Sequence, residues 1–326
     1  MSDVPTTQIL DPQLRPTTWD EYIGQQSIKD NLHILLTAAA GRKQQPEHIL
    51  FYGPPGLGKT TLSHLIAKEM KTDIKITSGP AIEKVGDLAS ILTNLSDGDI
   101  LFIDEIHRLN TNIEEVLYPA MESGVLDIII GKGPSARTIQ LDLPPFTLIA
   151  ATTKIASLSA PLRSRFSGGV FKLEFYSHLE MEKIIYQSAG KLNIKITDGG
   201  VHAIARRSRS TPRTANYFLK RIRDYAEVHK TGITEDTVLA ALAMIGVDEL
   251  GLRQTDRDVL LAIIDTFNGG PVGVKTIATA THEEVESIES VIEPYLIQKG
   301  LLDLTSRGRV ATEEAYKHFN KKYVEK

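Results

Sequence analysis

The 326-residue sequence contains no cysteine. This absence excludes disulfides, thiolate nucleophiles, iron–sulfur clusters and zinc sites built on cysteine. Long hydrophobic runs are also missing, since no stretch of about 18 or more apolar residues occurs. Residues 1–16 mix polar residues with prolines and lack the basic start and apolar run of a signal peptide. We therefore expect a cytoplasmic protein without a membrane span.

The sequence also lacks a strong excess of charge of one sign. Lysine and arginine number 37 against 41 aspartates and glutamates, and a net charge of −4 does not by itself indicate a nucleic-acid-binding protein. The charges are unevenly distributed, because residues 205–230 hold eight basic and two acidic residues whereas residues 282–299 are rich in glutamate. The basic stretch fits a solvated helix face or a contact surface. The acidic stretch is a poor candidate for a groove of DNA.

Hydrophobic residues make up 41% and charged residues 24% of the chain, which is ordinary for folded proteins and excludes a largely disordered chain. At roughly 100–200 residues per domain, the length predicts two or three domains. The first half alternates helical patterns with short apolar runs, which lie at residues 48–52, 74–77, 100–103 and 147–151. This alternation is typical of a parallel sheet with helices on both faces. We predict an α/β domain over residues 1–175.

A β-hairpin is predicted within this domain. Its strands are residues 126–130 and 137–141, and the turn-forming residues Gly131 to Pro134 join them. Three consecutive isoleucines, Ile128 to Ile130, favour an ordinary core hairpin that is buried on both faces.

Strand patterns fade after Phe175. Four segments with helical spacing follow, and they predict a small all-α domain over residues 176–247. Residues 248–326 are predicted to form three helices and a hairpin whose turn is Ser306 to Gly308, which is a winged-helix arrangement.

The segment Gly53 to Thr60 fits the phosphate-loop pattern G-x-x-x-x-G-K-[ST], and it follows a predicted strand and opens a predicted helix. Glycine allows the backbone to curl until successive N–H groups converge on phosphate oxygens, and the helix N-terminus adds positive potential. We expect Lys59 to reach the β and γ phosphates and the Thr60 hydroxyl to bind Mg²⁺.

The apolar run at residues 100–103 ends in Asp104 and Glu105. Acidic residues at a strand end are common solubility devices, but a phosphate loop upstream favours a catalytic pair. We predict that Asp104 lies beside the metal, through water, and that Glu105 polarises the attacking water. The neighbouring His107 is assigned no role.

Phosphoryl transfer needs further polar and cationic groups. Thr153 follows the strand at residues 147–151, where its hydroxyl is placed to orient water or contact the γ-phosphate. Arg163 and Arg165 stand close together and fit either a solvated basic turn or an arginine finger that acts on a neighbouring subunit. Arg213 follows Thr211-Pro212 at a helix start and is a candidate sensor of the γ-phosphate.

These motifs together resemble AAA+ ATPases, and longer strings resemble the RuvB family, the motors of Holliday junction branch migration. The strings include Arg15-Pro16 through Gln25, Asp142 to Ile149, Ala160 to Phe166, Gly270 to Gly273, Glu293 to Gln298 and Arg307 to Thr312. The resemblance implies a P-loop AAA+ domain, a helical lid and a winged-helix DNA-binding domain. It also implies ATP and Mg²⁺ as ligands.

The resemblance assigns sensor 1 to Thr153, the arginine finger to Arg165 and sensor 2 to Arg213. It also implies an ATP site formed by a larger set of residues: Leu14, Arg15, Ile23, Gly56, Leu57, Gly58, Lys59, Thr60, Thr61, Arg163, Tyr176 and Arg213. It further implies a hexameric ring on DNA, RuvA and RuvC as partners, and a role in recombination, repair and the SOS response.

In the resembling family, the element that matches Ile128 to Ile130 docks RuvA, so the hairpin has this second interpretation. We predict DNA contact by Arg307 and Arg309 of the wing, through phosphates and without reading bases. The wing departs from the family pattern at Leu304 and Ser306, which affects how tightly it grips DNA.

Two alternatives remain at this point. One is a winged-helix regulator whose ATPase domain only switches its assembly, and sequence-specific duplex binding would distinguish it. The other is a different AAA+ function, clamp loading or protein unfolding. No aromatic pore-loop motif typical of unfoldases is found, and a winged helix stands where a clamp loader carries a helical collar.

Overall fold

A computed structural model describes residues 12–130 and 137–323. The predicted turn at residues 131–134 lies outside them. By backbone contacts the chain forms two compact units, each described by itself below. Of the described residues, the sheet unit comprises 15–53, 57–130 and 137–174, and the helical unit comprises 12–14, 54–56 and 175–323. No helix in the described part of the chain is long and apolar enough to cross a membrane.

A five-stranded parallel sheet forms the centre of the sheet unit, in the order β2-β3-β6-β1-β7. The strands are β1 (Ile49–Tyr52), β2 (Ile74–Ser78), β3 (Ile100–Asp104), β6 (Thr147–Thr152) and β7 (Gly169–Lys172). The predicted α/β architecture is confirmed. The sequence pattern did not predict β7, because this short edge strand alternates half-buried and exposed residues and gives no continuous apolar run.

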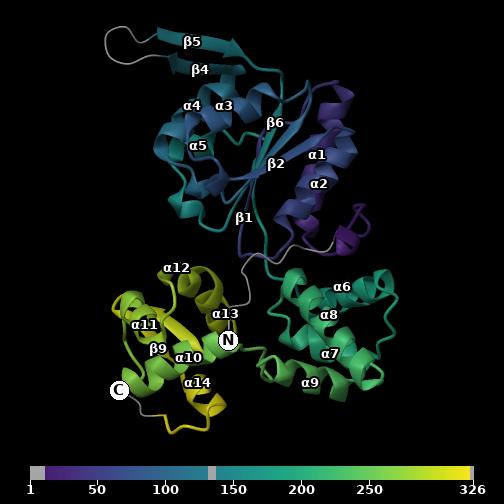
Figure 1. Cartoon of the computed structure of the whole chain (residues 1–326), viewed down its shortest axis with the longest axis vertical. Helices are drawn as coiled ribbons and strands as arrows, with labels where there is room; N and C mark the ends of the chain where they lie inside the picture. The colour runs from purple at the N-terminus through teal and green to yellow at the C-terminus, as the bar shows by residue number, and fades with distance from the viewer. Residues whose placement is uncertain (1–11, 131–136, 324–326) are drawn as a thin grey trace. The chain divides into compact units, whose positions relative to one another are not determined.

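Helices cover both faces of this sheet, with α1 and α2 on one side and α3, α4 and α5 on the other (Figure 1). Their bounds are α1 (Gln26–Gly41), α2 (Lys59–Met70), α3 (Val85–Thr93), α4 (Thr111–Ser123) and α5 (Ala160–Ser164). Short 3₁₀ helices lie at Pro12–Leu14, Gly79–Ala81, Ile106–Arg108 and Ile155–Ser157. A buried core between the sheet and the second group of helices includes Leu101, Leu117, Leu148 and Phe166. Burial of these side chains fixes the strand ends that carry the predicted site.

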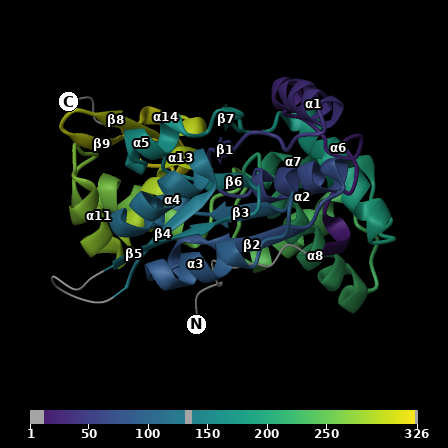
Figure 2. The same ribbon diagram turned by 90° about the horizontal axis from the view of Figure 1, so that it is seen from above.

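The predicted hairpin is present as β4 (Val125–Ile130) and β5 (Arg137–Asp142), which form a two-stranded sheet of their own. Both Figure 1 and the view from above in Figure 2 place it beside α3 and α4. Ile139 and Leu141 of β5 are 44% and 36% exposed. The expectation of a core hairpin buried on both faces is therefore wrong for β5, which neither joins the main sheet nor buries both faces. The side chains of Ile128 to Ile130, on which that expectation was based, lie outside the described residues.

The helical unit begins with four helices, α6 (His178–Lys191), α7 (Asp198–Arg207), α8 (Pro212–His229) and α9 (Glu235–Met244). Local sequence sets their starts: Ser177 and Glu180 form a capping box on α6, and Pro212 occupies the first turn of α8. The apolar stripe of α8 is buried, with Phe218 and Ile222 fully inaccessible. This matches the amphipathic pattern on which the helix was predicted.

The C-terminal part contains three helical segments and a wing. They are α10 (Gln254–Leu261) with a π-helical turn at Ala262–Thr266, α11 (Val274–Thr281), and an interrupted helix of α12 (Val285–Ser287), a π-helical turn at Ile288–Ile292 and α13 (Glu293–Gln298). The wing is β8 (Leu302–Thr305) and β9 (Gly308–Ala311), followed by α14 (Glu313–His318). Three helices were predicted before the wing, and the third of them is interrupted by the π-helical turn. The interruption precedes Pro294, which has no N–H for a helical hydrogen bond.

Candidate functional site

The phosphate loop follows the carboxyl end of β1 and opens α2. Gly53 and Gly58 have φ angles of 137° and 101°, a region that favours glycine. A Cβ on Gly53 would lie 2.6 Å from the Leu173 carbonyl oxygen, and a Cβ on Gly58 would lie 2.8 Å from the Tyr22 hydroxyl. The loop is therefore confined to glycine at both positions. The loop runs directly into the N-terminus of α2, the helix end whose dipole favours a phosphate.

Lys59 is the first residue of α2 and is 7% exposed. Its Nζ donates a hydrogen bond of 2.8 Å to the Gly53 carbonyl oxygen, so the ammonium lies inside the loop. Thr60 and Thr61 follow in the same helical turn, and Leu57 is fully buried beneath the loop. The residues present fit a triphosphate, because a buried cation and a helix N-terminus converge on one glycine-lined cradle.

The predicted acidic pair lies at the carboxyl end of β3, two strands away from β1 in the same parallel sheet. Asp104 ends the strand, and its Oδ1 accepts a hydrogen bond of 3.0 Å from the Glu105 N–H. Glu105 turns the chain with a φ of 49°. The Thr153 hydroxyl, just after β6, donates a hydrogen bond of 3.1 Å to Glu105 Oε2. The fold thus joins two residues that sequence analysis could only place on separate strands.

His107 is a further member of this cluster, and sequence analysis assigned it no role. Its side chain is 6% exposed, and its Nδ1 lies 3.2 Å from Glu105 Oε2. The same nitrogen lies 3.0 Å from the Thr152 hydroxyl oxygen. Its position two residues after Glu105 was the only sequence signal. A lone histidine near a strand end carries no information until the packing of β3 against β6 is known.

The two candidate finger arginines differ in their surroundings. Arg163 is exposed, whereas Arg165 lies against α4. The Arg165 guanidinium carbon stands 4.4 Å from the centre of the Tyr118 ring, and Nη2 lies 3.1 Å from Glu122 Oε1. Its Nη1 donates a hydrogen bond of 2.7 Å to the Pro161 carbonyl oxygen. The solvated-turn interpretation fits Arg163, but Arg165 is held in a defined place on the sheet unit.

The remaining predicted nucleotide residues are divided between the two units. In the helical unit, Leu14 and Tyr176 are 5% and 4% exposed, and the Tyr176 N–H donates to the Ser210 carbonyl oxygen at 3.1 Å. The Arg213 N–H donates to the Gly56 carbonyl oxygen at 3.4 Å, so the tip of the phosphate loop packs on the start of α8. In the sheet unit, Arg15 and Ile23 are partly buried. Burial lowers the pKa of the Arg15 guanidinium.

The two arginines of the wing that were predicted to contact DNA differ in exposure and in their partners. Arg307 lies in the two-residue turn between β8 and β9, and its side chain is exposed. Arg309 lies on β9, where Nε and Nη2 donate to the two carboxylate oxygens of Glu293 at 2.7 and 3.1 Å. The Glu293 side chain is 5% exposed, and Arg309 also approaches Glu289 at 3.6 Å. The hydrogen bond to Glu293 raises the pKa of Arg309. The guanidinium of Arg309 is thus engaged within the wing domain.

The basic stretch at residues 205–230 is only partly a solvated face. Arg209 is 7% exposed, and its Nη1 donates to both oxygens of the fully buried Asp256 at 3.0 and 3.2 Å. Its guanidinium also lies 4.4 Å from the centre of the Tyr295 ring. Arg207 is 9% exposed as well. Arg209 therefore holds the four-helix part against the C-terminal part, whereas Arg207 Nη1 donates to the Ala203 carbonyl oxygen of its own helix at 3.1 Å.

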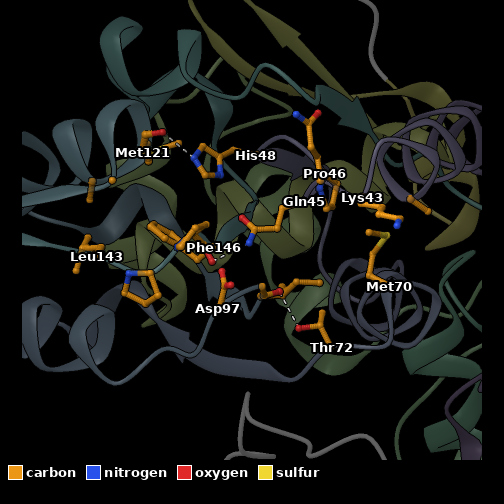
Figure 3. A pocket seen from close by; sticks show the side chains of 18 of the residues that line it. Lys43, Gln45, Pro46, His48, Met70, Thr72, Asp97, Met121, Leu143 and Phe146 are labelled. Atoms are coloured by element: carbon orange, nitrogen blue, oxygen red, sulfur yellow. Dashed lines mark hydrogen bonds between the residues drawn. The ribbon is translucent and has the colours of Figure 1, made fainter.

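A separate cavity of about 1230 Å³ lies at the amino ends of strands β1, β3 and β6, opposite to the strand ends that carry the phosphate loop and the acidic pair (Figure 3). His48 lies on its wall. Its Nδ1 accepts the Leu148 N–H at 2.9 Å, so its Nε2 carries the proton and donates to the Met121 carbonyl oxygen at 3.0 Å. Burial lowers the pKa of this imidazole. None of the predicted nucleotide residues is among the described residues that line this cavity.

Comparison with protein families finds three matches in succession along the chain. Residues 14–172 match the Holliday junction DNA helicase RuvB P-loop domain, residues 176–248 match the RuvB AAA lid domain, and residues 249–320 match the RuvB C-terminal winged helix domain.

Among curated proteins, two relatives are Holliday junction branch migration complex subunits RuvB. The protein from Fusobacterium nucleatum subsp. nucleatum is 53% identical over 98% of this chain and 96% of its own length. The protein from Dehalococcoides mccartyi is 56% identical over 96% of this chain and 90% of its own length. Among solved structures, the Thermotoga maritima RuvB Holliday junction branch migration motor is similar with a TM-score of 0.88 and 45% identity, covering 96% of this chain and 100% of that chain. A mutant of that motor gives a TM-score of 0.89 at 45% identity, covering 95% of this chain and 99% of that chain.

Proposed function

The chain belongs to the RuvB family, and we propose that it drives Holliday junction branch migration through the residues described above. It is an ATP-dependent branch migration enzyme and a P-loop AAA+ ATPase with a helical lid and a winged-helix domain. The observation that carries this conclusion is that one chain holds an intact phosphate loop, a lid and a wing in the order of the family. It acts on DNA as a subunit of a complex. The regulator and clamp-loader alternatives are not supported.

We propose that Gly56, Gly58, Lys59 and Thr60 hold the triphosphate, with Asp104 beside the metal. Bound Mg²⁺·ATP supplies the reactive phosphoryl group and a cation that neutralises its charge. The chain's own part is to present N–H groups, the Lys59 ammonium and the Thr60 hydroxyl to the phosphates. The constraint on Gly53 and Gly58 supports this, because a Cβ at either position would clash with the walls of the loop.

Glu105 is proposed to orient and polarise the attacking water. A carboxylate that acts this way must be aimed by its neighbours, and the Thr153 hydroxyl donates to it at 3.1 Å. His107 approaches the same carboxylate oxygen at 3.2 Å. We therefore propose Thr153 as the sensor of the γ-phosphate and His107 as a positioning residue for Glu105.

Arg165 is proposed as the finger that acts on the ATP of a neighbouring subunit in a hexameric ring. Such a cation neutralises charge that develops on the phosphoryl group, an effect worth about 10³–10⁵ in rate where measured. In the single chain the Tyr118 ring and the Glu122 carboxylate contact the guanidinium, so the finger role requires Arg165 to exchange these partners for the neighbouring nucleotide. Arg163, exposed two residues earlier, is proposed as a second cation toward the same nucleotide.

The base and ribose side of the nucleotide is proposed to be lined by Leu14, Arg15, Ile23 and Tyr176. Arg213 is proposed as sensor 2, and the hydrogen bond from its N–H to the Gly56 carbonyl oxygen supports this by tying the start of α8 to the phosphate loop. A change at the phosphates would then reach the lid through the backbone of α8.

DNA contact is proposed at the wing. Sequence analysis predicted both Arg307 and Arg309, and we now narrow the phosphate contact to Arg307. Its side chain is exposed at the tip of the hairpin, whereas Glu293 engages Arg309 through two hydrogen bonds. Phosphate contacts carry no base specificity, which suits a motor that must pass every sequence.

RuvA is proposed to dock on the β4–β5 hairpin near Ile128 to Ile130. The exposed Ile139 and Leu141 on β5 support an apolar docking surface. RuvC is proposed as a further partner. Homologous recombination, DNA repair and the SOS response are proposed as the processes served, and the cytoplasm as the location. The domains are proposed as residues 1–175, 176–247 and 248–326, a division supported by the three family-model segments.

ATP-driven dissociation of a synthetic four-way junction, with and without RuvA and at two salt concentrations, tests the motor directly. We expect RuvA-stimulated dissociation that weakens as salt rises, because phosphate contacts release counterions. No dissociation with RuvA present would contradict the proposal. A preference for one duplex sequence over another in competition binding would instead favour a regulator.

Mixing two inactive variants tests the shared site. Arg165→Ala is expected to bind ATP normally without hydrolysing it, and Lys59→Ala is expected to lose ATP binding. In mixed rings, an intact finger can meet an intact phosphate loop, so part of the ATPase activity should return. Activity of Arg165→Ala alone at the level of the unaltered protein refutes the finger assignment.

A further inference from the structure

A cluster of two histidines and a glutamate lies in the helical unit and belongs to neither proposed site. His178 and Glu182 stand one turn apart on α6, and His202 faces them from α7. The His178 Nε2 lies 2.9 Å from the His202 Nδ1, and both nitrogens approach Glu182 Oε1, at 3.2 and 3.0 Å. Three atoms that can each act as a metal ligand therefore converge on one another from two helices.

Protons alone cannot satisfy the three contacts. A carboxylate brings no proton, and each facing nitrogen brings one proton or none. If one nitrogen is protonated, the other nitrogen and the carboxylate oxygen still face each other with lone pairs. If both are protonated, two N–H groups oppose each other across 2.9 Å. A cation at equal distances from the three atoms accepts a lone pair from each and so satisfies all three contacts at once.

From this convergence we propose a divalent transition-metal site formed by His178 Nε2, Glu182 Oε1 and His202 Nδ1, with Zn²⁺ as the expected ion. Two imidazoles and one carboxylate suit Zn²⁺ and related ions, whereas Mg²⁺ and Ca²⁺ prefer ligand sets made only of oxygen. With metal–ligand distances of about 2.1 Å, an ion equidistant from the three atoms would lie about 1.2 Å out of their plane.

Solvent reaches the site, which leaves room for water as a fourth ligand. The side chains of His178, Glu182 and His202 are 37%, 23% and 51% exposed. The ion would join the first turns of α6 to α7, directly after Tyr176 and the cap residue Ser177. It would therefore cross-link the lid next to the segment proposed to contact the nucleotide. The inference stands apart from the proposed ATP chemistry, because none of its ligands belongs to the phosphate site.

The test is binding of Zn²⁺ alone to the untagged, nucleotide-free full chain, measured by equilibrium dialysis in excess Mg²⁺ to occupy oxygen-rich sites. One Zn²⁺ per chain is expected, with an affinity that falls at least 100-fold in His178→Ala and in His202→Ala. The exposed His33 on α1 gives the matched control, because His33→Ala removes a histidine outside the cluster and should bind Zn²⁺ unchanged. Zn²⁺ should raise the Tm of the unaltered protein and of this control only.

A second variant gives a positive signal that misfolding cannot produce. The chain has no cysteine, so His202→Cys introduces the only thiol. Bound Co²⁺ should then show a thiolate-to-cobalt charge-transfer band that is absent from the unaltered protein and removed by adding His178→Ala. Zn²⁺ binding that is equal in the unaltered protein and in His202→Ala, or no stoichiometric binding at all, overturns the proposal.

Discussion

The two wing arginines should respond to substitution in opposite ways. Arg307 is exposed in the turn, and its proposed contact is with a phosphate. Arg309 lies against Glu293, whose side chain is 5% exposed and accepts two hydrogen bonds from the guanidinium. Arg307→Ala should therefore weaken DNA binding and leave the fold intact. Arg309→Ala should destabilise the wing domain.

The magnitudes follow from these environments. Removing one partner of a fully buried ion pair costs about 3–5 kcal/mol, because the remaining charge stays buried and unpaired. The Arg309 side chain is 18% exposed, so water reaches the pair and we expect a smaller loss of about 2–3 kcal/mol in the free energy of unfolding. At about 4–8 °C per kcal/mol for a domain of this size, that loss lowers the Tm of the corresponding transition by about 8–24 °C. Arg307→Ala should change it by less than about 0.5 kcal/mol.

DNA binding gives the complementary readout. Each phosphate contact that is lost reduces the slope of log Kobs against log salt by about 0.9, so Arg307→Ala should bind all duplexes more weakly and with a shallower salt dependence. The double variant Arg309→Met with Glu293→Gln removes both charges together and should recover most of the stability lost in Arg309→Ala.

Thermal unfolding and fluorescence anisotropy at several salt concentrations measure both effects. If Arg309→Ala unfolds like the unaltered protein and flattens the salt dependence as much as Arg307→Ala, the assignment of Arg309 to a structural role is refuted.

Three further outcomes are expected. Gly58→Ala should weaken binding of a fluorescent ATP analogue at least tenfold, since a Cβ there would lie 2.8 Å from a tyrosine hydroxyl, whereas Gly86→Ala meets nothing within 4 Å and should bind normally. Thr153→Val should lower kcat about 10–100-fold with nucleotide binding retained, because the hydrogen bond to the Glu105 carboxylate is lost. Thr153→Ser keeps the hydroxyl and should restore kcat. A fall in nucleotide affinity instead of kcat would argue against the sensor role. Burial lowers the pKa of His48 in the folded protein. As the pH falls below about 6.5, this histidine is therefore protonated first in the unfolded chain. The free energy of unfolding should decline from that pH down to the lower pKa of the folded state. Denaturant titrations should show this decline flattened in His48→Gln, and an equal decline in both proteins would contradict it.

The phosphate loop shows how much local sequence determines. Its glycines, lysine and threonine lie within eight consecutive residues, so the pattern predicted the turn, the helix start and the cradle together. The four helices of the lid followed from apolar periodicity for the same reason, since a 3.6-residue repeat is a property of neighbouring residues. The edge strand β7 was missed because it is short and only half-buried, and its pairing with β1 comes from residues far away in the chain.

The sequence by itself determined which chemistry this chain carries, because phosphate binding, acidic strand ends and amphipathic helices are encoded in short contiguous segments. Only the tertiary structure decided which side chains meet. Glu105 and Thr153 meet at the ends of the neighbouring strands β3 and β6. Arg309 of β9 is paired with Glu293 of α13, and His202 of α7 contacts His178 of α6. Each of these contacts depends on the packing of separate elements, and the energy that selects them is distributed over a buried core. The spacing of residues along the chain therefore does not predict these contacts.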